Sequence, residues 1–379
     1  MEAFIHDAVR TPRGKGNERG ALADQRPVDL LAPLFAALAE RNHLDTETVD
    51  DVTLGCSTAT GEQGANIAKA AAHFAGWDYR SSGGTVSRLC CSGVDAIATA
   101  AAKIDAGMDD VAVAGGVESM SRVPIFSDHG SLFSDPEVAS AGGFVHMGVA
   151  ADIVATLGEI TREECDAYAV ESHRRAAAAR FEPAMVPVNG LDHDEAIRAG
   201  MTVEQLASFE PAFADMGNDV VDQKLPNLGP IDHVHTIATA PQIVDGASLL
   251  LIGKHQEGAR ARIVAAANAG VKPPLLTATA PATRRALERA GMSIKDIDLF
   301  EVNESFAAIV LHYMRHFDLD PDRVNVNGGA IAMGHPLGAT GGMLAATLLD
   351  ELERRDLETG LLTIPAAAGI GAALILQRV

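Results

Sequence analysis

Aromatic residues and cysteines are scarce in this chain of 379 residues. Aromatics make up 4% of it, whereas 47% of its residues are hydrophobic, so the core must consist mainly of Ala, Val, Leu and Ile. The four cysteines, Cys56, Cys90, Cys91 and Cys165, have neither the spacing of metal ligands nor the density of a disulfide framework. The glycine-rich stretches are too short and misplaced for a dinucleotide-binding fingerprint. We therefore expect no metal site and no redox cofactor.

Basic residues are also few, since 30 Lys and Arg stand against 51 Asp and Glu, which gives a formal net charge of −21. This balance argues against nucleic acid and against an anionic membrane surface as partners, but it leaves room for an anionic small ligand. No uninterrupted apolar run reaches the roughly 18 residues that span a bilayer. The first residues lack the pattern of a secretory signal, so we expect a cytoplasmic protein.

Two turns that contain glycines carry the residues best suited to catalysis. The first is Leu89–Gly93 (LCCSG) and the second is Gly334–Gly338 (GHPLG), and each leads into a predicted helix of small residues. If the turns meet in space, the thiol of Cys90 faces the imidazole of His335. That pair is the minimum apparatus for a nucleophilic cysteine. For either residue alone, a buried structural cysteine or a core histidine is the commoner case.

Short strand-like runs alternate with helical stretches, which predicts an α/β fold with a mostly parallel sheet and helices on its faces. The expected strands are Phe4–Ala8, Val52–Leu54, Val111–Ala114, Ala247–Gly253, Ala261–Ala267, Leu299–Glu301, Val324–Val326 and Leu361–Ile364. The expected helices are Leu30–Arg41, Gly64–Ala75, Val94–Ala106, Thr161–Ala179, Thr202–Leu206, Pro281–Gly291, Phe306–Phe317 and Met343–Arg355.

The two halves of the chain resemble each other. Ser92–Gly93 matches Thr340–Gly341 at one constant offset, and Asp51–Leu54 (DVTL) matches Asp296–Leu299 (DIDL). A duplicated α/β domain explains this similarity, and chance similarity between βαβ units is the alternative.

Residues 121–242 differ in character from both halves, because they are richer in Pro, Asp and His and give few strand signals. We expect them to form an inserted loop domain that binds substrate, since loops over a rigid sheet commonly carry ligand contacts. The expected N-terminal domain comprises residues 1–120 and 243–265. The expected C-terminal domain comprises residues 266–379.

Six motifs follow one another in an order that resembles the thiolase family, whose members make or cleave 3-ketoacyl-CoA thioesters. They are Arg10–Lys15 (RTPRGK), Leu89–Gly93 (LCCSG), Gly115–Ser121 (GGVESMS), His146–Gly148 (HMG), Asn303–Ala307 (NESFA) and Gly328–Gly338 (GGAIAMGHPLG). The resemblance covers essentially the whole chain. It implies duplicated βαβαβαββ domains forming a five-layered α-β-α-β-α core, a homodimer or homotetramer, and CoA as a substrate rather than a cofactor.

The resemblance assigns Cys90 as the nucleophile that carries the acyl group. The N-terminus of the following helix would lower its pKa. Cys91 is the structural rival, and the spacing to the following Ser-Gly pair favours Cys90. By resemblance, His335 activates Cys90 and, with a water on Asn303, stabilises the enolate of the substrate's thioester. Alternatively, Asn303 caps the helix predicted over Phe306–Phe317.

Further CoA contacts are implied by the resemblance alone. His146 and Met147 match a loop that lines the pantetheine tunnel, and Arg198 matches a basic residue that contacts the nucleotide end of CoA. A surface salt bridge to Asp194 or Glu195 is the alternative for Arg198.

The chain departs from the family near its C-terminus, where thiolases carry a second catalytic cysteine that moves the proton at the substrate α-carbon. The matching position holds Pro365, and no cysteine follows Cys165. Loss of such a group typically costs about 10²–10⁴ in rate. Two residues further on, the resemblance implies that the amide of Ala367 joins that of Cys90 in a second oxyanion site.

We therefore expect an acyltransferase of the acetyl-CoA C-acyltransferase or C-acetyltransferase type in fatty acid metabolism. It would cleave 3-ketoacyl-CoA with CoA through an acyl-Cys90 intermediate, or run the reverse Claisen condensation. His335 with a water, or Cys91, would take over the missing proton transfer. The alternatives are a thiolase-fold enzyme with diverted chemistry because of Pro365, and a non-catalytic acyl-CoA-binding protein. A ketoacyl synthase relative is more remote, because its histidines stand in a different sequence context.

Overall fold

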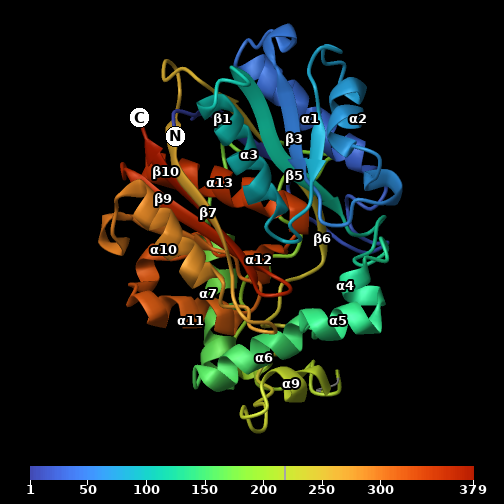
Figure 1. Ribbon diagram of the computed structural model, residues 1–379, viewed down its shortest axis with the longest axis vertical. Coiled ribbons are helices and arrows are strands. Elements are labelled where there is room, and N and C mark those ends of the chain that lie inside the picture. The colour runs from blue at the N-terminus through green and yellow to red at the C-terminus, as the bar shows by residue number, and fades with distance from the viewer. Residues whose placement is uncertain (217–218) are drawn as a thin grey trace.

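The computed structural model describes residues 1–216 and 219–379 and has an α/β fold (Figure 1). Ten strands form one hydrogen-bonded sheet system in the order β4-β3-β5-β6-β1-β7-β10-β9-β8, with β2 paired to β6. The strands are β1 Phe4–Arg10, β2 Gly14–Lys15, β3 Asp51–Gly55, β4 Gly84–Val86, β5 Val111–Ser119, β6 Val244–Gly253, β7 Ala261–Gly270, β8 Leu299–Val302, β9 Thr359–Ala366 and β10 Ile370–Arg378.

Most strand pairs are antiparallel, so the prediction of a mostly parallel sheet is wrong. Parallel pairing is found in β3–β4, β3–β5 and β8–β9 among the residues that the structure describes. β6 returns from the long insertion to pair antiparallel with β5 along its length, and a tight turn reverses the chain between β9 and β10. Helical crossovers impose parallel pairing, and these two connections are not crossovers.

Two helices lie between the halves of the sheet system, α3 (Ser92–Asp105) and α13 (Leu337–Arg354). Their apolar residues share one buried cluster with strands of both halves, for example Val94 and Leu344 with Leu250 and Leu374. Outer clusters pack α1 (Pro27–Arg41) and α2 (Ile67–Phe74) on one half, and α10 (Thr279–Ala290) and α11 (Ala307–Phe317) on the other. The result is the predicted five-layered α-β-α-β-α core.

The structure supports the duplication and corrects its register. β3 and β5 begin the same number of residues before β8 and β9, and each pair is parallel around one central helix. In that register Asp51 corresponds to Leu299, so the match of Asp51–Leu54 to Asp296–Leu299 is three residues out. The matches at Ser92–Gly93 and Thr340–Gly341 keep the common offset, and both fall in the first turns of α3 and α13.

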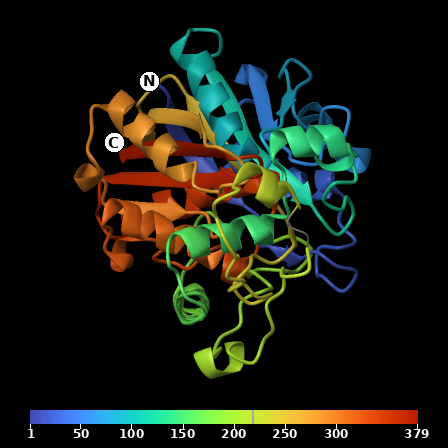
Figure 2. The ribbon, with the colours of Figure 1, turned by 60° about the horizontal axis from the view of Figure 1, so that its bottom comes forward.

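The insertion crosses one end of the sheet system, green to yellow in Figure 2. Its helices are α4 Ser131–Ser134, α5 Pro136–Gly142, α6 Met147–Leu157, α7 Arg162–Ala178, α8 Val203–Leu206 and α9 Asp219–Lys224. The described part of the insertion contributes no named strand, as expected. The expected boundary between residues 265 and 266 falls inside β7, which pairs with β10 of the C-terminal half.

One segment, Pro136–Leu157, is long and apolar enough by length and composition alone to cross a membrane. It consists of α5 and α6, which are separated by a turn with Gly143 in the left-handed region, and 56% of its most apolar 18-residue window is buried inside the protein.

Two further local predictions fail. The strand expected at Val324–Val326 is replaced by a short 3-10 turn, Pro321–Arg323, and a single bridge from Val324 to Phe300. The last helix begins at Leu337 rather than Met343, because Pro336 fits a helix N-cap and the glycines that follow pack closely against α3.

Candidate active site

The two glycine turns meet at the centre of the molecule, where α3 and α13 begin. A Cβ added to Gly93 would lie 2.7 Å from the carbonyl oxygen of Gly338, and one added to Gly341 would lie 2.3 Å from the amide nitrogen of Val94. Only glycine allows this approach of the two backbones. Gly93 follows Cys90 by three residues and Gly338 follows His335 by three, so the contact brings the thiol turn and the imidazole turn together.

Local hydrogen bonds hold the Cys90 turn in shape. The hydroxyl of Ser92 accepts from the amide of Arg88 at 2.8 Å and donates to the carbonyl of Leu89 at 2.5 Å. Leu89 has a φ of 51°, an uncommon conformation for a residue with a Cβ. Arg88 forms a two-point ion pair with Asp95 one turn into α3, at 2.9 and 3.2 Å. The chain therefore enters α3 through a sharp turn that presents Cys90.

Cys90 lies in the wall of a cavity. The cavity is mainly apolar, and its lining residues are Ser57, Thr58, Leu89, Cys90, Ile125, Phe126, Asp128, Phe133, Phe144, Met147, Leu337 and Ala367. Three predicted site residues, Cys90, Met147 and Ala367, thus share one cavity although they come from distant parts of the sequence.

The Cys90 side chain is a thiol in the resting site. Burial, and then the negative charge of Glu118, raise its pKa to about 12. The expectation that the start of α3 lowers this pKa is therefore wrong, because loss of water around the sulfur outweighs the helix. Cys91 is fully buried outside the cavity lining, and its sulfur donates to the carbonyl of Ile364 at 3.2 Å. The structure thus separates a cavity thiol from a structural one.

His335 is a neutral base. Burial, and then the charge of Arg13, lower its pKa to about 3. Its Nδ1 lies 2.7 Å from Oγ1 of Thr340, and its Nε2 lies 3.4 Å from Nδ2 of Asn303. If Nδ1 carries the proton and donates to Thr340, Nε2 is left as the acceptor. The main chain of His335 donates to Gln242 at 3.1 Å, which ties this turn to the end of the insertion.

Asn303 does not cap a helix, so that alternative is wrong. α11 begins at Ala307, and its N-cap is Phe306. Nδ2 of Asn303 donates to Ser305 at 2.9 Å, while its Oδ1 is buried and has no hydrogen-bond partner in the described part of the chain. A buried acceptor without a partner commonly holds an ordered water. Its position beside His335 fits the predicted oxyanion role.

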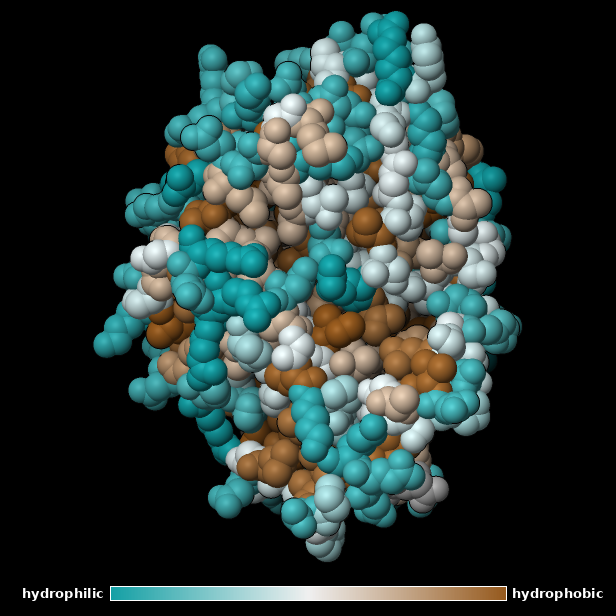
Figure 3. Space-filling model, viewed as in Figure 1, coloured by the Kyte–Doolittle hydropathy of each residue, from teal (hydrophilic) through white to brown (hydrophobic). Residues whose placement is uncertain are grey.

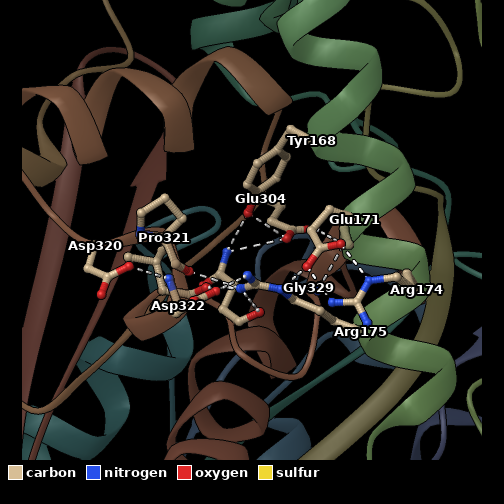
Figure 4. Close-up of polar contacts among 12 residues, drawn as sticks. Tyr168, Glu171, Arg174, Arg175, Glu304, Asp320, Pro321, Asp322 and Gly329 are labelled. Carbon is tan, nitrogen blue, oxygen red and sulfur yellow. Dashed lines mark hydrogen bonds and ion pairs between the residues drawn. The ribbon is translucent and has the colours of Figure 1, made fainter. Parts of the chain in front are cut away.

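Glu304 fixes the loop that carries Asn303 (Figure 4). Its buried carboxylate accepts from Tyr168 at 2.8 Å and Ser172 at 2.7 Å on α7, and from the amide of Ile331 at 2.9 Å. A Cβ on Gly329 would lie 2.4 Å from the Cδ atom of Glu304, so the close packing requires glycine there. The NESFA and GGAIAMGHPLG motifs therefore support each other through one carboxylate.

Glu118 links the cavity wall to the His335 turn, and sequence reasoning gave it no role. Its fully buried carboxylate accepts from the amides of Ser57 at 2.8 Å, Thr58 at 3.0 Å and Gly338 at 2.9 Å, and from Nε2 of Gln63 at 2.9 Å. The signal that could have indicated its role is a charged residue at the end of an otherwise small and apolar strand, in the GGVESMS motif.

The predicted CoA contacts separate into two groups. Met147 lines the cavity, and His146 caps α6 by accepting from the amide of Gly148 at 3.2 Å. The His146 ring stacks on Phe213 at 5.3 Å, a partner that the sequence did not indicate. Arg198 is exposed and lies outside the cavity lining.

The proposed salt bridge of Arg198 is not formed. Asp194 is instead buried between Arg10, at 2.9 Å, and Arg13, at 3.2 Å, while Glu195 lies 3.9 Å from Lys15. The RTPRGK motif therefore anchors the insertion to β1. No group of three or more His, Cys, Asp or Glu suitable for a metal ion is found within residues 1–216 and 219–379.

Family models match the chain over nearly its whole length. The thiolase N-terminal domain matches residues 3–256, and the thiolase C-terminal domain matches residues 258–378. The chain belongs to the thiolase family. Its activity is that of a thiolase-type acyltransferase, and its substrates are acyl-CoA thioesters and CoA.

Individual relatives agree with the family over their full lengths. The chain is 40% identical to an Escherichia coli 3-oxoadipyl-CoA/3-oxo-5,6-dehydrosuberyl-CoA thiolase, with 100% of both chains covered. It is 39% identical to a 3-ketoacyl-CoA thiolase of Psychrobacter cryohalolentis, covering 100% of this thiolase and 98% of that one. The crystal structure of the Bacillus anthracis acetyl-CoA acetyltransferase superposes with a TM-score of 0.87 at 34% identity, covering 100% of this chain and 98% of that one.

Proposed function

We propose that this thiolase is an acetyl-CoA C-acyltransferase that works with Cys90 as its only catalytic thiol and with His335 as its proton carrier. The observation that carries the proposal is the backbone contact between the two helix starts, which brings the turn of the cavity thiol Cys90 against the turn of the neutral imidazole His335. Cleavage of a 3-ketoacyl-CoA and the reverse Claisen condensation use the same groups.

In the cleavage direction, His335 takes the proton of Cys90 as the sulfur attacks the C3 carbonyl of the substrate. The resulting oxyanion accepts hydrogen bonds from the amides of Cys90 and Ala367. The C2–C3 bond then breaks, its electron pair goes to the acetyl-CoA enolate, and the acyl group remains on the sulfur as a thioester. Protonated His335 and a water on Asn303 stabilise the enolate oxygen.

The cycle closes without a second thiol. The proton that His335 received from Cys90 passes to C2 of the enolate, directly or through the water, and acetyl-CoA leaves. CoA then binds, His335 accepts its thiol proton, and the CoA sulfur attacks the acyl-Cys90 thioester. The Cys90 sulfur leaves and takes back the proton. The pKa values of about 12 and 3 support transfer during attack over a thiolate that exists beforehand.

The position of Pro365 supports this assignment. Pro365 lies buried in β9, where its partner in β10 is Gly371. Pairing of β9 with β8 ends at Thr363, so the N–H that proline lacks costs no hydrogen bond to β8. Two residues later, Ala367 lines the Cys90 cavity. By the family resemblance a cysteine at this position would lie close to the reacting atoms, whereas proline supplies no proton donor there.

Intact-protein mass spectrometry tests the proposal. Incubation with a 3-ketoacyl-CoA should add the mass of one acyl group, peptide mapping should locate it on Cys90, and CoA should remove it as the acyl-CoA. Tight binding of acyl-CoA without an adduct would contradict the proposal and favour a non-catalytic acyl-CoA-binding protein.

Pro365→Cys should raise the rate of thiolysis by about tenfold or more, because a positioned acid near C2 contributes about 10²–10⁴ when its placement is ideal. The matched control is Pro365→Ala, which makes the same backbone change without a thiol and should not raise the rate. Steady-state thiolysis followed by loss of the 3-ketoacyl-CoA absorbance compares the three proteins.

Equal rates in Pro365→Cys and Pro365→Ala would contradict the prediction that proton transfer at C2 is helped by a second thiol. An adduct on Cys90 that never yields acetyl-CoA in the parent protein would instead favour diverted chemistry limited to acyl transfer.

A further inference from the structure

The Cys90 cavity has an aromatic wall that no assignment above uses. Phe126, Phe133 and Phe144 contact one another, with ring centroids 4.6 Å apart for the first pair, 4.9 Å for the last two and 6.4 Å for Phe126 and Phe144. All three line the cavity. They come from the segment around α4 and α5, near the start of the insertion. The three rings form one continuous apolar surface facing the space next to the thiol.

The remaining lining extends this apolar surface around the cavity. Leu89, Ile125, Met147 and Leu337 are the other large apolar members, and they surround Cys90 with side chains from four separate segments. Figure 3 shows hydrophobic side chains gathered on the face over α4 and α5, and Phe126 is 43% exposed. The cavity thus continues outward as an apolar surface.

Charge in the cavity has one sign. Among the lining residues that the structure describes there is no Lys, Arg or His, and the charged member is Asp128. Asp128 lies in an exposed turn of the lining. A second negative group in the cavity would therefore meet repulsion and no cationic partner.

We propose that the acyl substrate is an uncharged aliphatic or aryl-terminated 3-ketoacyl chain and that chains ending in a carboxylate are rejected. The inference rests on the proposed function, because it places the acyl group of acyl-Cys90 in this cavity. It separates the chain from the 3-oxoadipyl-CoA thiolase that it matches at 40% identity, whose named substrate carries a terminal carboxylate.

Kinetics with a matched substrate series tests the inference. From 3-oxobutanoyl-CoA to 3-oxooctanoyl-CoA, kcat/KM should rise by about fourfold for each CH₂ that enters the cavity. 3-Oxoadipyl-CoA should react at least ~100-fold less efficiently than 6-methyl-3-oxoheptanoyl-CoA, which replaces the carboxylate with an isopropyl group of similar shape. Equal or better use of 3-oxoadipyl-CoA would overturn the inference.

Reversal of the charge at Asp128 gives a second test. Asp128→Arg should raise the ratio of kcat/KM for 3-oxoadipyl-CoA over its uncharged analogue by about threefold or more, the size typical of one exposed charge pair. Glu257→Arg, the same change at an exposed turn outside the cavity lining, should leave the ratio unchanged. An equal shift in both variants would show a general effect of net charge and contradict a role of Asp128.

Binding without turnover distinguishes failure of this inference from failure of the proposed function. Calorimetry should give a lower Kd for octanoyl-CoA than for adipoyl-CoA whether or not Cys90 reacts. Tighter binding of adipoyl-CoA would overturn the substrate inference, whereas the expected order together with no adduct on Cys90 would overturn the proposed function alone.

Discussion

Cys90→Ala should lower thiolysis by at least about 10⁴-fold and abolish the covalent acyl adduct, since the acyl group then has no sulfur to which it can transfer. Cys90 is the thiol in the cavity lining, and the other cysteines among the described residues are buried away from it. The measurement is steady-state thiolysis together with intact-protein mass spectrometry after incubation with a 3-ketoacyl-CoA.

Cys91→Ala is the matched control. It removes a neighbouring sulfur that donates only to the carbonyl of Ile364, so activity and adduct should both persist. Persistence of the adduct in Cys90→Ala, or its loss in Cys91→Ala, would show that the assignment of the nucleophile to Cys90 is wrong.

The pH dependence of Cys90 alkylation reports how the thiol is activated. Because its pKa is raised to about 12, the thiolate fraction should grow tenfold per pH unit between about pH 7 and 10 without levelling off. A thiolate already paired with protonated His335 would give a flat profile over this range. The pKa of about 3 for His335 predicts the rising profile, since the imidazole is neutral throughout.

His335→Gln should lower kcat by about 10²–10⁴-fold, because glutamine can fill the space but cannot accept the Cys90 proton. The loss should appear in kcat more than in KM, since the imidazole acts on the reacting atoms. Rapid-mixing experiments should show slower formation of acyl-Cys90. Formation at the parental rate would contradict the role of His335 as the base in the first step.

Two variants serve as controls for His335. Thr340→Val keeps the imidazole but removes the oxygen 2.7 Å from Nδ1, and about a fivefold loss is expected from one hydrogen bond. His312→Gln changes a histidine on α11 outside the site and should leave kcat unchanged. A loss in Thr340→Val as large as that in His335→Gln would indicate that orientation of the ring, rather than its proton affinity, limits the reaction.

Much of the candidate site could be predicted because its residues stand in short local patterns. Glycines beside Cys90 and His335 indicated turns at helix starts, and the helix from Ser92 was expected within two residues. The charge state of these residues could not be predicted. Cys90 is a thiol because burial and the charge of Glu118 raise its pKa. Glu118 is distant in sequence and lies near Cys90 because it stands at the end of β5.

The errors in the predicted fold also arise from contacts between residues that are distant in sequence. Val324–Val326 has the composition of a strand, but tertiary packing leaves only one bridge from Val324 to Phe300. Six residues of α13 were missed because glycine lowers helix propensity, whereas close contact with α3 requires glycine there. Local propensity is a weak guide wherever two backbones touch.

Residue order alone indicated the α/β class, the duplication and the insertion, and it singled out Cys90 and His335 as the candidate thiol and imidazole. Only the tertiary structure decided that the helix starts touch, that Cys90 opens on a cavity and Cys91 does not, and that an aromatic wall and Asp128 surround the reacting space. The physical reason is that pKa, burial and cavity shape arise from groups far apart along the chain, whose distances exist only once the sheets and central helices have packed.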